Sequence, residues 1–317
     1  MEITQMLQWG GALIAALFVL VRGADLFVDG AKKIGISMGM SSFAVGVLIV
    51  GLGTSLPELA SSIAAVMAGT TEIVIANVVG SNITNILLIV GVLAIMGGPV
   101  MINKDLLKTE LPIFFISTVH FIASVYDGVV DRIEALLLFG TLSAYMWYLF
   151  SPHNVAKEEM EVKNGKTNKL GIKPIVFVII GIAAVLVGAH YTVEMAVNIA
   201  TGFSIPIGLV SIAAIAIGTS LPELFVSIQA VRSGETDLAI GNIFGSNAFN
   251  ILLVVGIPGL MAPLIAGEVV MMVGIPILVA ASLILFINGL ARQVQKWEGV
   301  MMLLFFAFFM VKLVEFV

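Results

Sequence analysis

Two glutamates, Glu58 and Glu223, lie within long apolar stretches of the chain, each inside the same seven-residue string. The string is Gly-Thr-Ser-Leu-Pro-Glu-Leu, and it occurs at Gly53–Leu59 and again 165 residues later at Gly218–Leu224. Thr and Ser precede each Glu by four and three residues, so a helix would place all three side chains on one face. Each string therefore predicts a stripe of oxygen atoms, formed by Thr54, Ser55 and Glu58 in the first copy and by Thr219, Ser220 and Glu223 in the second.

A second polar pair follows each string. At the same offset, Gly53–Gly91 and Gly218–Gly256 are identical at 24 of 39 positions without a gap, which identifies an internal duplication. In each copy a Ser and an Asn lie four residues apart, so that a hydroxyl and an amide share one face of the next helix. These residues are Ser81 and Asn85 in the first copy and Ser246 and Asn250 in the second.

The atom types in these motifs favour hard cations. Pro57 and Pro222 have no amide hydrogen and clash with the carbonyl four residues earlier, so each helix is expected to kink and expose carbonyl oxygens. Carboxylate, hydroxyl, amide and carbonyl oxygens suit Ca²⁺ and Na⁺, whereas neither motif contains the His or Cys that zinc, copper or iron would favour. Two carboxylates would balance one Ca²⁺. If Na⁺ uses the same oxygens, the two ions compete, and competition at a shared site is the basis of exchange.

The surrounding composition is that of an integral membrane protein. Hydrophobic residues make up 60% of the chain and charged residues 11%, with a mean hydropathy of +1.13; soluble domains have about 25% charged residues. The lack of alternating short segments excludes a β-barrel and predicts an all-α fold. A carboxylate in mid-membrane costs about 2.5 kcal/mol or more, so Glu58 and Glu223 are the strongest functional signals. Ten apolar stretches are predicted to span the bilayer, near 6–28, 43–67, 73–96, 111–126, 133–150, 174–199, 207–231, 238–260, 268–288 and 298–317.

The distribution of Lys and Arg predicts how these ten spans are oriented. With the N-terminus outside, the inside loops hold twelve Lys and Arg residues and the outside loops hold only Arg132, which is a strong positive-inside bias. The C-terminus is then also outside. Residues 1–150 and 174–317 each contain five predicted spans, and a charged cytoplasmic connector at 151–173 separates them. Because five is odd, the halves must face opposite ways, as two inverted five-helix repeats.

The paired Gly-Thr-Ser-Leu-Pro-Glu segments, each followed by Gly-Ser-Asn, resemble the two alpha repeats of the calcium/cation antiporter superfamily. The similarity is specifically to prokaryotic sodium/calcium exchangers and their potassium-dependent relatives, and the repeats correspond to residues 51–91 and 216–256. The resemblance implies a mid-membrane site built from the second, third, seventh and eighth helices. It also implies which residues coordinate ions: Gly51 and Ala216 through backbone carbonyls, and Thr54, Ser55, Glu58, Ser81, Asn85, Thr219, Ser220, Glu223, Ser246 and Asn250 through side chains.

The function implied by the resemblance is exchange of Ca²⁺ for Na⁺ across the cell membrane by alternating access. It involves no enzyme activity, no cofactor, no nucleic acid and no soluble partner, only the two ions and the lipid bilayer. Many sodium/calcium exchangers have an acidic residue at one of the positions held here by Asn85 and Asn250. Amides at both positions leave open the number of Na⁺ ions, a need for K⁺, and coupling to protons. Exchange of Ca²⁺ or another cation for H⁺ is the alternative, although the proton-coupled branch tends to have Gly-Asn-Ala-x-Glu instead of Gly-Ser-Asn.

Other interpretations of the same residues remain open. Ser55 or Ser220 could be the nucleophile of an intramembrane hydrolase, but no His shares either motif and an enzyme has no need of a duplicated, inverted site. The same oxygens would also serve a passive cation channel. Small residues in membrane helices commonly mediate packing, and Gly241 and Gly245 have the spacing of such a contact. Four further asparagines could cap or bridge the broken helices, namely Asn77, Asn82, Asn242 and Asn247.

Overall fold

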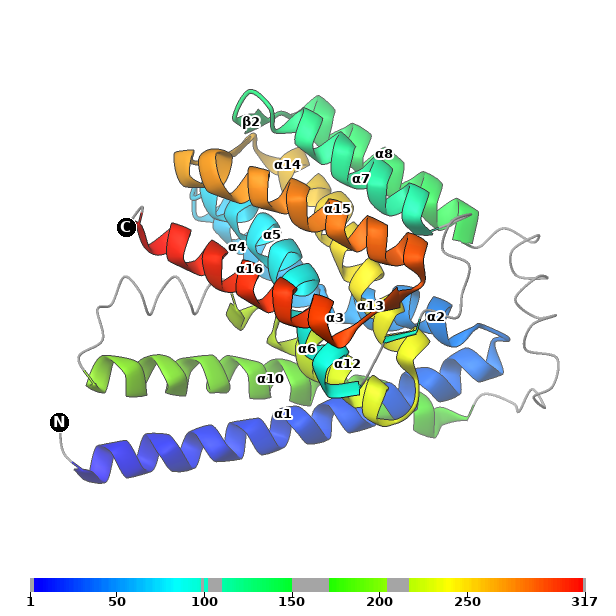
Figure 1. Ribbon diagram of the computed structural model, residues 1–317, viewed down its shortest axis with the longest axis vertical. Helices are drawn as coiled ribbons and strands as arrows, with labels where there is room; N and C mark the ends of the chain where they lie inside the picture. The colour runs from blue at the N-terminus through cyan, green and yellow to red at the C-terminus, as the bar shows by residue number, and fades with distance from the viewer. Residues whose placement is uncertain (1–2, 98–99, 102–109, 150–170, 204–216, 316–317) are drawn as a thin grey trace.

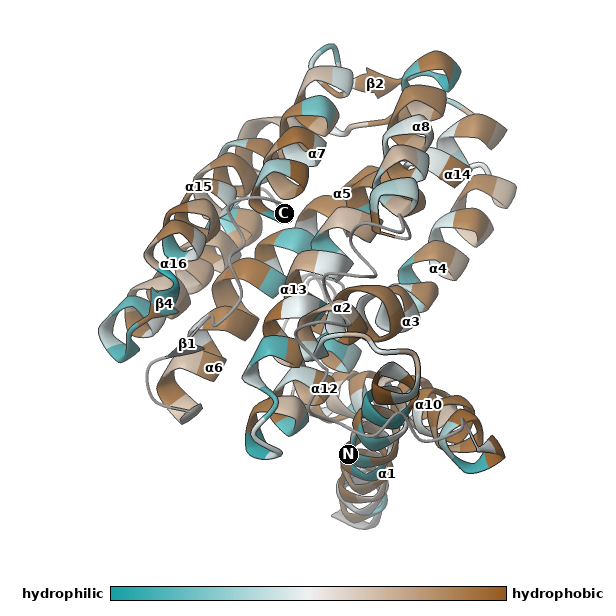
Figure 2. Cartoon of the chain, turned by 90° about the vertical axis from the view of Figure 1, so that its right-hand side faces the viewer, coloured by the Kyte–Doolittle hydropathy of each residue, from teal (hydrophilic) through white to brown (hydrophobic). Residues whose placement is uncertain are grey.

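Helices account for almost all of the structure. The computed structural model describes residues 3–97, 100–101, 110–149, 171–203 and 217–315. Figure 1 shows the helices gathered in a bundle, with α1 (Ile3–Ser37) and α10 (Ile172–Gly202) lying as a pair along one side. Hydrophobic residues cover most of the helical surface (Figure 2). The predicted all-helical membrane architecture is confirmed.

Seven described helical stretches are long and apolar enough to cross a membrane: Leu7–Ser37, Ser42–Met67, Glu72–Met96, Ile172–Gly202, Thr236–Met261, Val270–Ala291 and Lys296–Glu315. Another helix, α7 (Glu110–Ser124), is apolar but shorter, and α8 (Arg132–Leu149) has 18 residues. The predicted span at 207–231 begins outside the described residues and ends in α12 (Leu221–Arg232). The connector at 151–173 also lies mostly outside them. The count of ten spans and the orientation of both termini therefore stay predictions.

The first repeat consists of two interrupted helices. The first contains α2 (Ser42–Val45), η1 (Gly46–Gly51), α3 (Leu52–Thr54) and α4 (Leu56–Met67), and the second contains α5 (Glu72–Ile83), η2 (Thr84–Ile89) and α6 (Val90–Gly97). The interruption falls at Ser55, so that Pro57 is in the first turn of α4, where its missing amide hydrogen is tolerated. The segments η1 and η2 are π-helical. Such turns shift the backbone hydrogen bonds and are frequent at functional sites.

Where the second repeat lies within the described residues, its elements follow those of the first at the offset of 165 residues. The counterparts of α2 and η1 would fall at 207–216, outside those residues. α12 has the bounds that this offset predicts from α4, and the break at Ser220 matches the break at Ser55. α13 (Thr236–Phe249), η4 (Asn250–Val254) and α14 (Gly256–Met261) correspond to α5, η2 and α6. Gly69 and Gly234 occupy equivalent turns with φ of 76° and 78°, a backbone region that favours glycine. The duplication therefore extends from the residues to the backbone.

Two short strand pairs connect the two halves of the chain. β1 (Val100–Met101) pairs with β4 (Gln293–Val294), and β2 (Val129–Val130) pairs with β3 (Leu264–Ile265), both antiparallel. The sequence analysis did not predict them, because two residues are too few to show an alternating pattern. Each pair joins one strand from the first half to one from the second.

α1 and α10 run antiparallel and pack backbone against backbone. A Cβ atom on Gly23 would lie 2.7 Å from the backbone nitrogen of Val185, and one on Gly188 would lie 2.6 Å from that of Leu20. Helices approach this closely only where glycine leaves room. α1 and α10 therefore form one packed unit beside the duplicated segments, and α1 also packs against α12.

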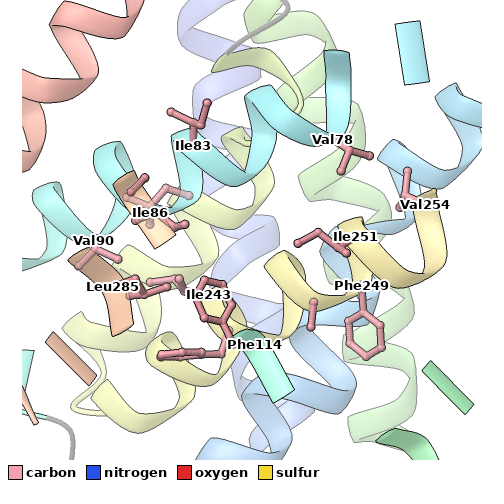
Figure 3. Packing of buried hydrophobic residues seen from close by; sticks show 14 of the residues in the cluster. Val78, Ile83, Ile86, Val90, Phe114, Ile243, Phe249, Ile251, Val254 and Leu285 are labelled. Atoms are coloured by element: carbon pink, nitrogen blue, oxygen red, sulfur yellow. The ribbon is translucent and has the colours of Figure 1, made fainter. Parts of the chain in front are cut away.

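α13 lies at the centre of the bundle. Its residues from Leu238 to Phe249 are all buried, and it packs along η1. A Cβ on Gly241 would lie 2.3 Å from the Phe43 carbonyl oxygen, and one on Gly245 would lie 2.8 Å from that of Val47, which confirms the predicted small-residue contact. Figure 3 shows buried hydrophobic residues of α5, α13, η4 and α15 (Ile275–Ala291) in one cluster, with Val78, Ile243, Ile251 and Leu285 among them. η5 (Val270–Gly274) and α16 (Lys296–Glu315) complete the bundle.

Candidate cation-binding site

The two glutamates lie at equivalent places in the two repeats. Glu58 is in the first turn of α4 and Glu223 is in the first turn of α12, and both are 0% exposed. The positive end of a helix dipole favours a negative side chain at this position. Two ionised carboxylates buried away from water need a compensating charge. A cation bound between them would supply it.

The repeats pack so that each glutamate-bearing helix contacts the other copy. α4, which carries Glu58, packs against η4, the segment that begins with Asn250. α12, which carries Glu223, packs against η2, the segment that contains Asn85. The offset of 165 residues exchanges these two contacts. The candidate site is therefore shared between the copies, with an approximate two-fold relation.

A buried hydrogen-bond network connects the first Gly-Thr-Ser-Leu-Pro-Glu-Leu string to the second copy. Thr54 Oγ1 lies 3.2 Å from both Ser246 Oγ and Asn242 Oδ1. Ser246 Oγ also lies 3.3 Å from Asn242 Oδ1 and 3.4 Å from the Gly51 carbonyl oxygen. The same carbonyl accepts the backbone N–H of Ser55 at 3.1 Å. Predicted ligand residues from both copies thus meet around Asn242.

Among the described residues, the equivalent contact in the other direction has fewer bonds; Ala216, the counterpart of Gly51, lies outside them. Ser81 Oγ and Thr219 Oγ1 lie 3.0 Å apart, and either hydroxyl can donate. Ser81 is buried, whereas Thr219 is partly exposed. This pair corresponds to Ser246 and Thr54 at the repeat offset, so both strings place their threonine against the serine of the opposite copy.

Two of the four additional asparagines, Asn82 and Asn242, bridge neighbouring segments through their side chains, as one interpretation of the sequence predicted. Asn82 Nδ2 donates to the carbonyl of Asn247 at 3.4 Å, and Asn250 Nδ2 donates to Asn82 Oδ1 at 3.3 Å. Asn242 Nδ2 donates to Ser227 Oγ at 2.9 Å and to the Glu223 carbonyl at 3.4 Å. Sequence reasoning did not include Asn242 in the site. The available signal was its recurrence with Asn77, four residues before a predicted ligand serine in both copies.

Several buried oxygen atoms at the site have no hydrogen-bond partner among the described residues. These atoms are both carboxylate oxygens of Glu58 and of Glu223, the hydroxyls of Ser55 and Ser220, and the amide oxygens of Asn85 and Asn250. A buried polar atom without a partner costs about 1–3 kcal/mol, and a hard cation would supply the missing partner. The described residues contain no group of three or more His, Cys, Asp and Glu side chains placed to hold a metal. The donor set therefore fits one divalent cation balanced by two carboxylates.

Eleven of the twelve predicted ligand residues lie in the described part of the chain, and all are buried except Thr219. Ala216 lies outside it. Hydrogen-bonding distances link Thr54, Ser246 and Gly51, and separately Ser81 and Thr219. The coordinating roles of these residues stay predictions.

This chain is similar to a known sodium/calcium exchanger and to other membrane proteins. It is 34% identical to the sodium/calcium exchanger MaX1 of Methanosarcina acetivorans, over 95% of this chain and 97% of that protein. It is 35% identical to the inner membrane protein YrbG of Escherichia coli, over 79% of each. A structure of the sodium-calcium exchanger NCX_Mj, soaked with zero Na⁺ and Ca²⁺, superposes with a TM-score of 0.80 at 28% identity, covering 98% of this chain and all of that one.

The family comparison matches both halves of the chain. The family model described as "Sodium/calcium exchanger protein" covers residues 9–151 and 173–314. The gap between the two matched ranges falls within the predicted connector. With the apolar helices described above, this match identifies a multi-pass protein of the cell membrane. The chain belongs to the sodium/calcium exchanger family.

Proposed function

We propose that this protein is a secondary antiporter that exchanges Ca²⁺ for Na⁺ across the cell membrane. The observation that carries the proposal is the buried pair Glu58 and Glu223, brought together from two duplicated segments with unpartnered oxygens around it. The names of the relatives support the choice of ions, since MaX1 is a sodium/calcium exchanger and NCX_Mj structures were soaked with Na⁺ and either Ca²⁺ or Sr²⁺. The proposed ligands are the carbonyls of Gly51 and Ala216 and the side chains of Thr54, Ser55, Glu58, Ser81, Asn85, Thr219, Ser220, Glu223, Ser246 and Asn250.

Charge balance explains why one site would exchange the two ions. Two carboxylates neutralise one Ca²⁺, and removing both ions would leave two like charges buried in a low-dielectric interior, where their repulsion is strong. The empty site is therefore costly to carry across the membrane. Na⁺ ions that occupy the same oxygens neutralise the carboxylates equally well and exclude Ca²⁺. The site then crosses loaded with one ion or the other, which couples the two fluxes.

We infer that α1 and α10 move against the rest of the bundle to open the site to one side at a time. The close glycine contacts at Gly23 and Gly188 hold the two helices together as a unit. In this arrangement, residues 1–150 and 174–317 are inverted five-helix halves with both termini outside, and the two access states are near mirror images. The matched bounds of α4 and α12 support this interpretation.

Uptake of radioactive Ca²⁺ into proteoliposomes tests the proposed function. Vesicles loaded with Na⁺ and diluted into Na⁺-free buffer should accumulate Ca²⁺, and dissipating the Na⁺ gradient should stop the uptake. Uptake driven instead by an outward H⁺ gradient would favour the proton-coupled alternative. Uptake that runs down the Ca²⁺ gradient without any counter-ion would indicate a channel, and cleavage of peptides without ion flux would indicate a hydrolase.

A further inference from the structure

We propose that Asn242 is a positioning residue that turns the hydroxyl protons of Thr54 and Ser246 away from the bound cation. The inference rests on the proposed function, because it assigns a role within the same site. Asn242 is 0% exposed and is not one of the predicted ion ligands. Its amide lies between α12 and the two hydroxyls that the site draws from opposite copies.

The orientation of the Asn242 amide follows from its neighbours. The carbonyl oxygen of Glu223, 3.4 Å from the amide nitrogen, can only accept a hydrogen bond. The NH₂ group must therefore face Glu223 and Ser227, and the amide oxygen must face Thr54 and Ser246. That oxygen lies 3.2 Å from Thr54 Oγ1 and 3.3 Å from Ser246 Oγ, so it can accept both protons.

The direction in which each hydroxyl donates its hydrogen bond matters for cation binding, because a hydroxyl has one proton and two lone pairs. A cation attracts the lone pairs and repels the proton, so a hydroxyl ligand needs an acceptor on the side away from the ion. Asn242 Oδ1 is such an acceptor for both hydroxyls. The two hydroxyls, 3.2 Å apart, can also bond to one another, and the Gly51 carbonyl at 3.4 Å is a further acceptor for each. Gly51 is itself a predicted ligand through that carbonyl. A proton donated to Asn242 instead leaves the Gly51 oxygen available to the ion.

The orientation of the two hydroxyls should affect the binding free energies of Ca²⁺ and Na⁺ to different degrees. The energy of an ion in the field of a fixed dipole is proportional to the charge of the ion, so a misdirected hydroxyl weakens Ca²⁺ binding about twice as much in free energy as Na⁺ binding. Loss of the acceptor should therefore change the ratio of the two affinities. A general loosening of the fold would weaken both by similar factors.

The test compares N242L, which has the shape of asparagine without an acceptor, with N242D, which keeps the acceptor oxygen. Calorimetry on the purified full chain measures the dissociation constants of Ca²⁺ and of Na⁺, each alone. We expect N242L to raise the Ca²⁺ constant at least about tenfold, equivalent to about 1.4 kcal/mol, and the Na⁺ constant by no more than about threefold. N242D should not weaken Ca²⁺ binding, because the acceptor is retained and the added carboxylate attracts the cation.

A matched control is N288L, since Asn288 is also a buried helical asparagine, and among the described residues its side chain hydrogen-bonds only to Met302 on α16. It should leave both constants unchanged. Equal factors for Ca²⁺ and Na⁺ in N242L, or unchanged constants, would overturn the proposal. If N242L does not fold, a tenfold loss of Ca²⁺ affinity in N242D would overturn it. Because the test measures binding and not transport, its outcome is independent of the proposed function. If the wild-type chain binds both ions without exchanging them, the proposed function is contradicted and the Asn242 test still applies.

Discussion

The two half-sites contain the same residues but are held differently. The threonine and serine hydroxyls contact each other in both halves. Thr54 and Ser246 are fully buried and both contact the Asn242 amide oxygen, whereas Thr219 is partly exposed and the amide nitrogen of Asn77, the counterpart of Asn242, has no partner among the described residues. Both halves retain a buried glutamate. Duplication therefore fixed the residue types, while the neighbouring helix of each copy decides which polar atoms are already oriented before an ion arrives.

The two copies also differ at the edge of the bundle. Lys32 on α1 forms an ion pair with Glu235, which precedes α13, and Glu235 also accepts a hydrogen bond of 2.8 Å from Ser42. At the repeat offset, Val197 and Thr70 occupy the positions of Lys32 and Glu235. An ion pair is impossible between them. One copy therefore ties a peripheral helix to the central bundle through charge, and the equivalent pair in the other copy has no charge to do so.

The largest predicted effect tests what the halves have in common. Glu58→Gln or Glu223→Gln should each lower the Ca²⁺ uptake rate by more than about 100-fold, because either change leaves one carboxylate to balance a divalent ion, a loss of about 2.7 kcal/mol or more. Uptake into proteoliposomes measures this, with equal insertion checked by quantifying the reconstituted protein. A wild-type rate in either variant would remove that glutamate from the site.

The close packing of α13 against η1 predicts the second-largest effect, a loss of stability. Gly245→Ala places a methyl group 2.8 Å from the Val47 carbonyl oxygen, where backbone must shift, and overpacking of this kind costs about 1–3 kcal/mol. The melting temperature in detergent should fall. Gly140→Ala is the control, since a Cβ there meets no described atom within 4 Å. Equal melting temperatures for the two variants would contradict the close contact of α13 with η1.

Threonine substitutions sharpen the comparison of the half-sites. Thr54→Val should raise the Ca²⁺ dissociation constant about tenfold and Thr219→Val about threefold, corresponding to about 1.4 and 0.7 kcal/mol. The reason is that Thr54 is a fully buried, already oriented hydroxyl, whereas water can replace the partly exposed Thr219 hydroxyl. Calorimetric titration of each variant gives the two constants. A larger effect of Thr219→Val than of Thr54→Val would show that orienting the hydroxyl before the ion binds does not increase affinity.

The smallest predicted effect concerns the peripheral ion pair. Lys32→Val introduces the residue of the other copy and should change the Ca²⁺ uptake rate by about two- to fivefold, consistent with the roughly 0.2–1 kcal/mol of a partly exposed pair. Lys33→Val is the matched control, because Lys33 forms its ion pair with Asp29 on the same helix, at 2.5 Å, and lies over the Phe177 ring of α10 rather than against α13. Rates measured on reconstituted variants decide the point. If both substitutions change the uptake rate equally, the ion pair between Lys32 and Glu235 does not contribute to transport.

The sequence was informative wherever residue type alone carries the signal. Apolar composition, the repeated string and the position of Pro57 predicted a membrane fold, a duplication and a broken helix, and the break at Ser55 lies two residues from that proline. The π-helical segments were beyond reach, because hydrophobic residues fit π and α turns alike. Asn242 was beyond reach for another reason. Its partners Thr54 and Ser246 depend on α13 packing along η1, a pairing of distant segments that local pattern does not encode.

The central claim is that one site, built jointly by both copies, binds either Ca²⁺ or Na⁺. Calorimetric titration of the purified chain with Ca²⁺, with and without saturating Na⁺, tests it most directly. The account predicts one Ca²⁺ per chain, no Ca²⁺ binding in saturating Na⁺, and loss of that single event in Glu58→Gln and in Glu223→Gln alike. Two Ca²⁺ per chain, or one Ca²⁺ retained by either variant at wild-type affinity, would contradict a shared site.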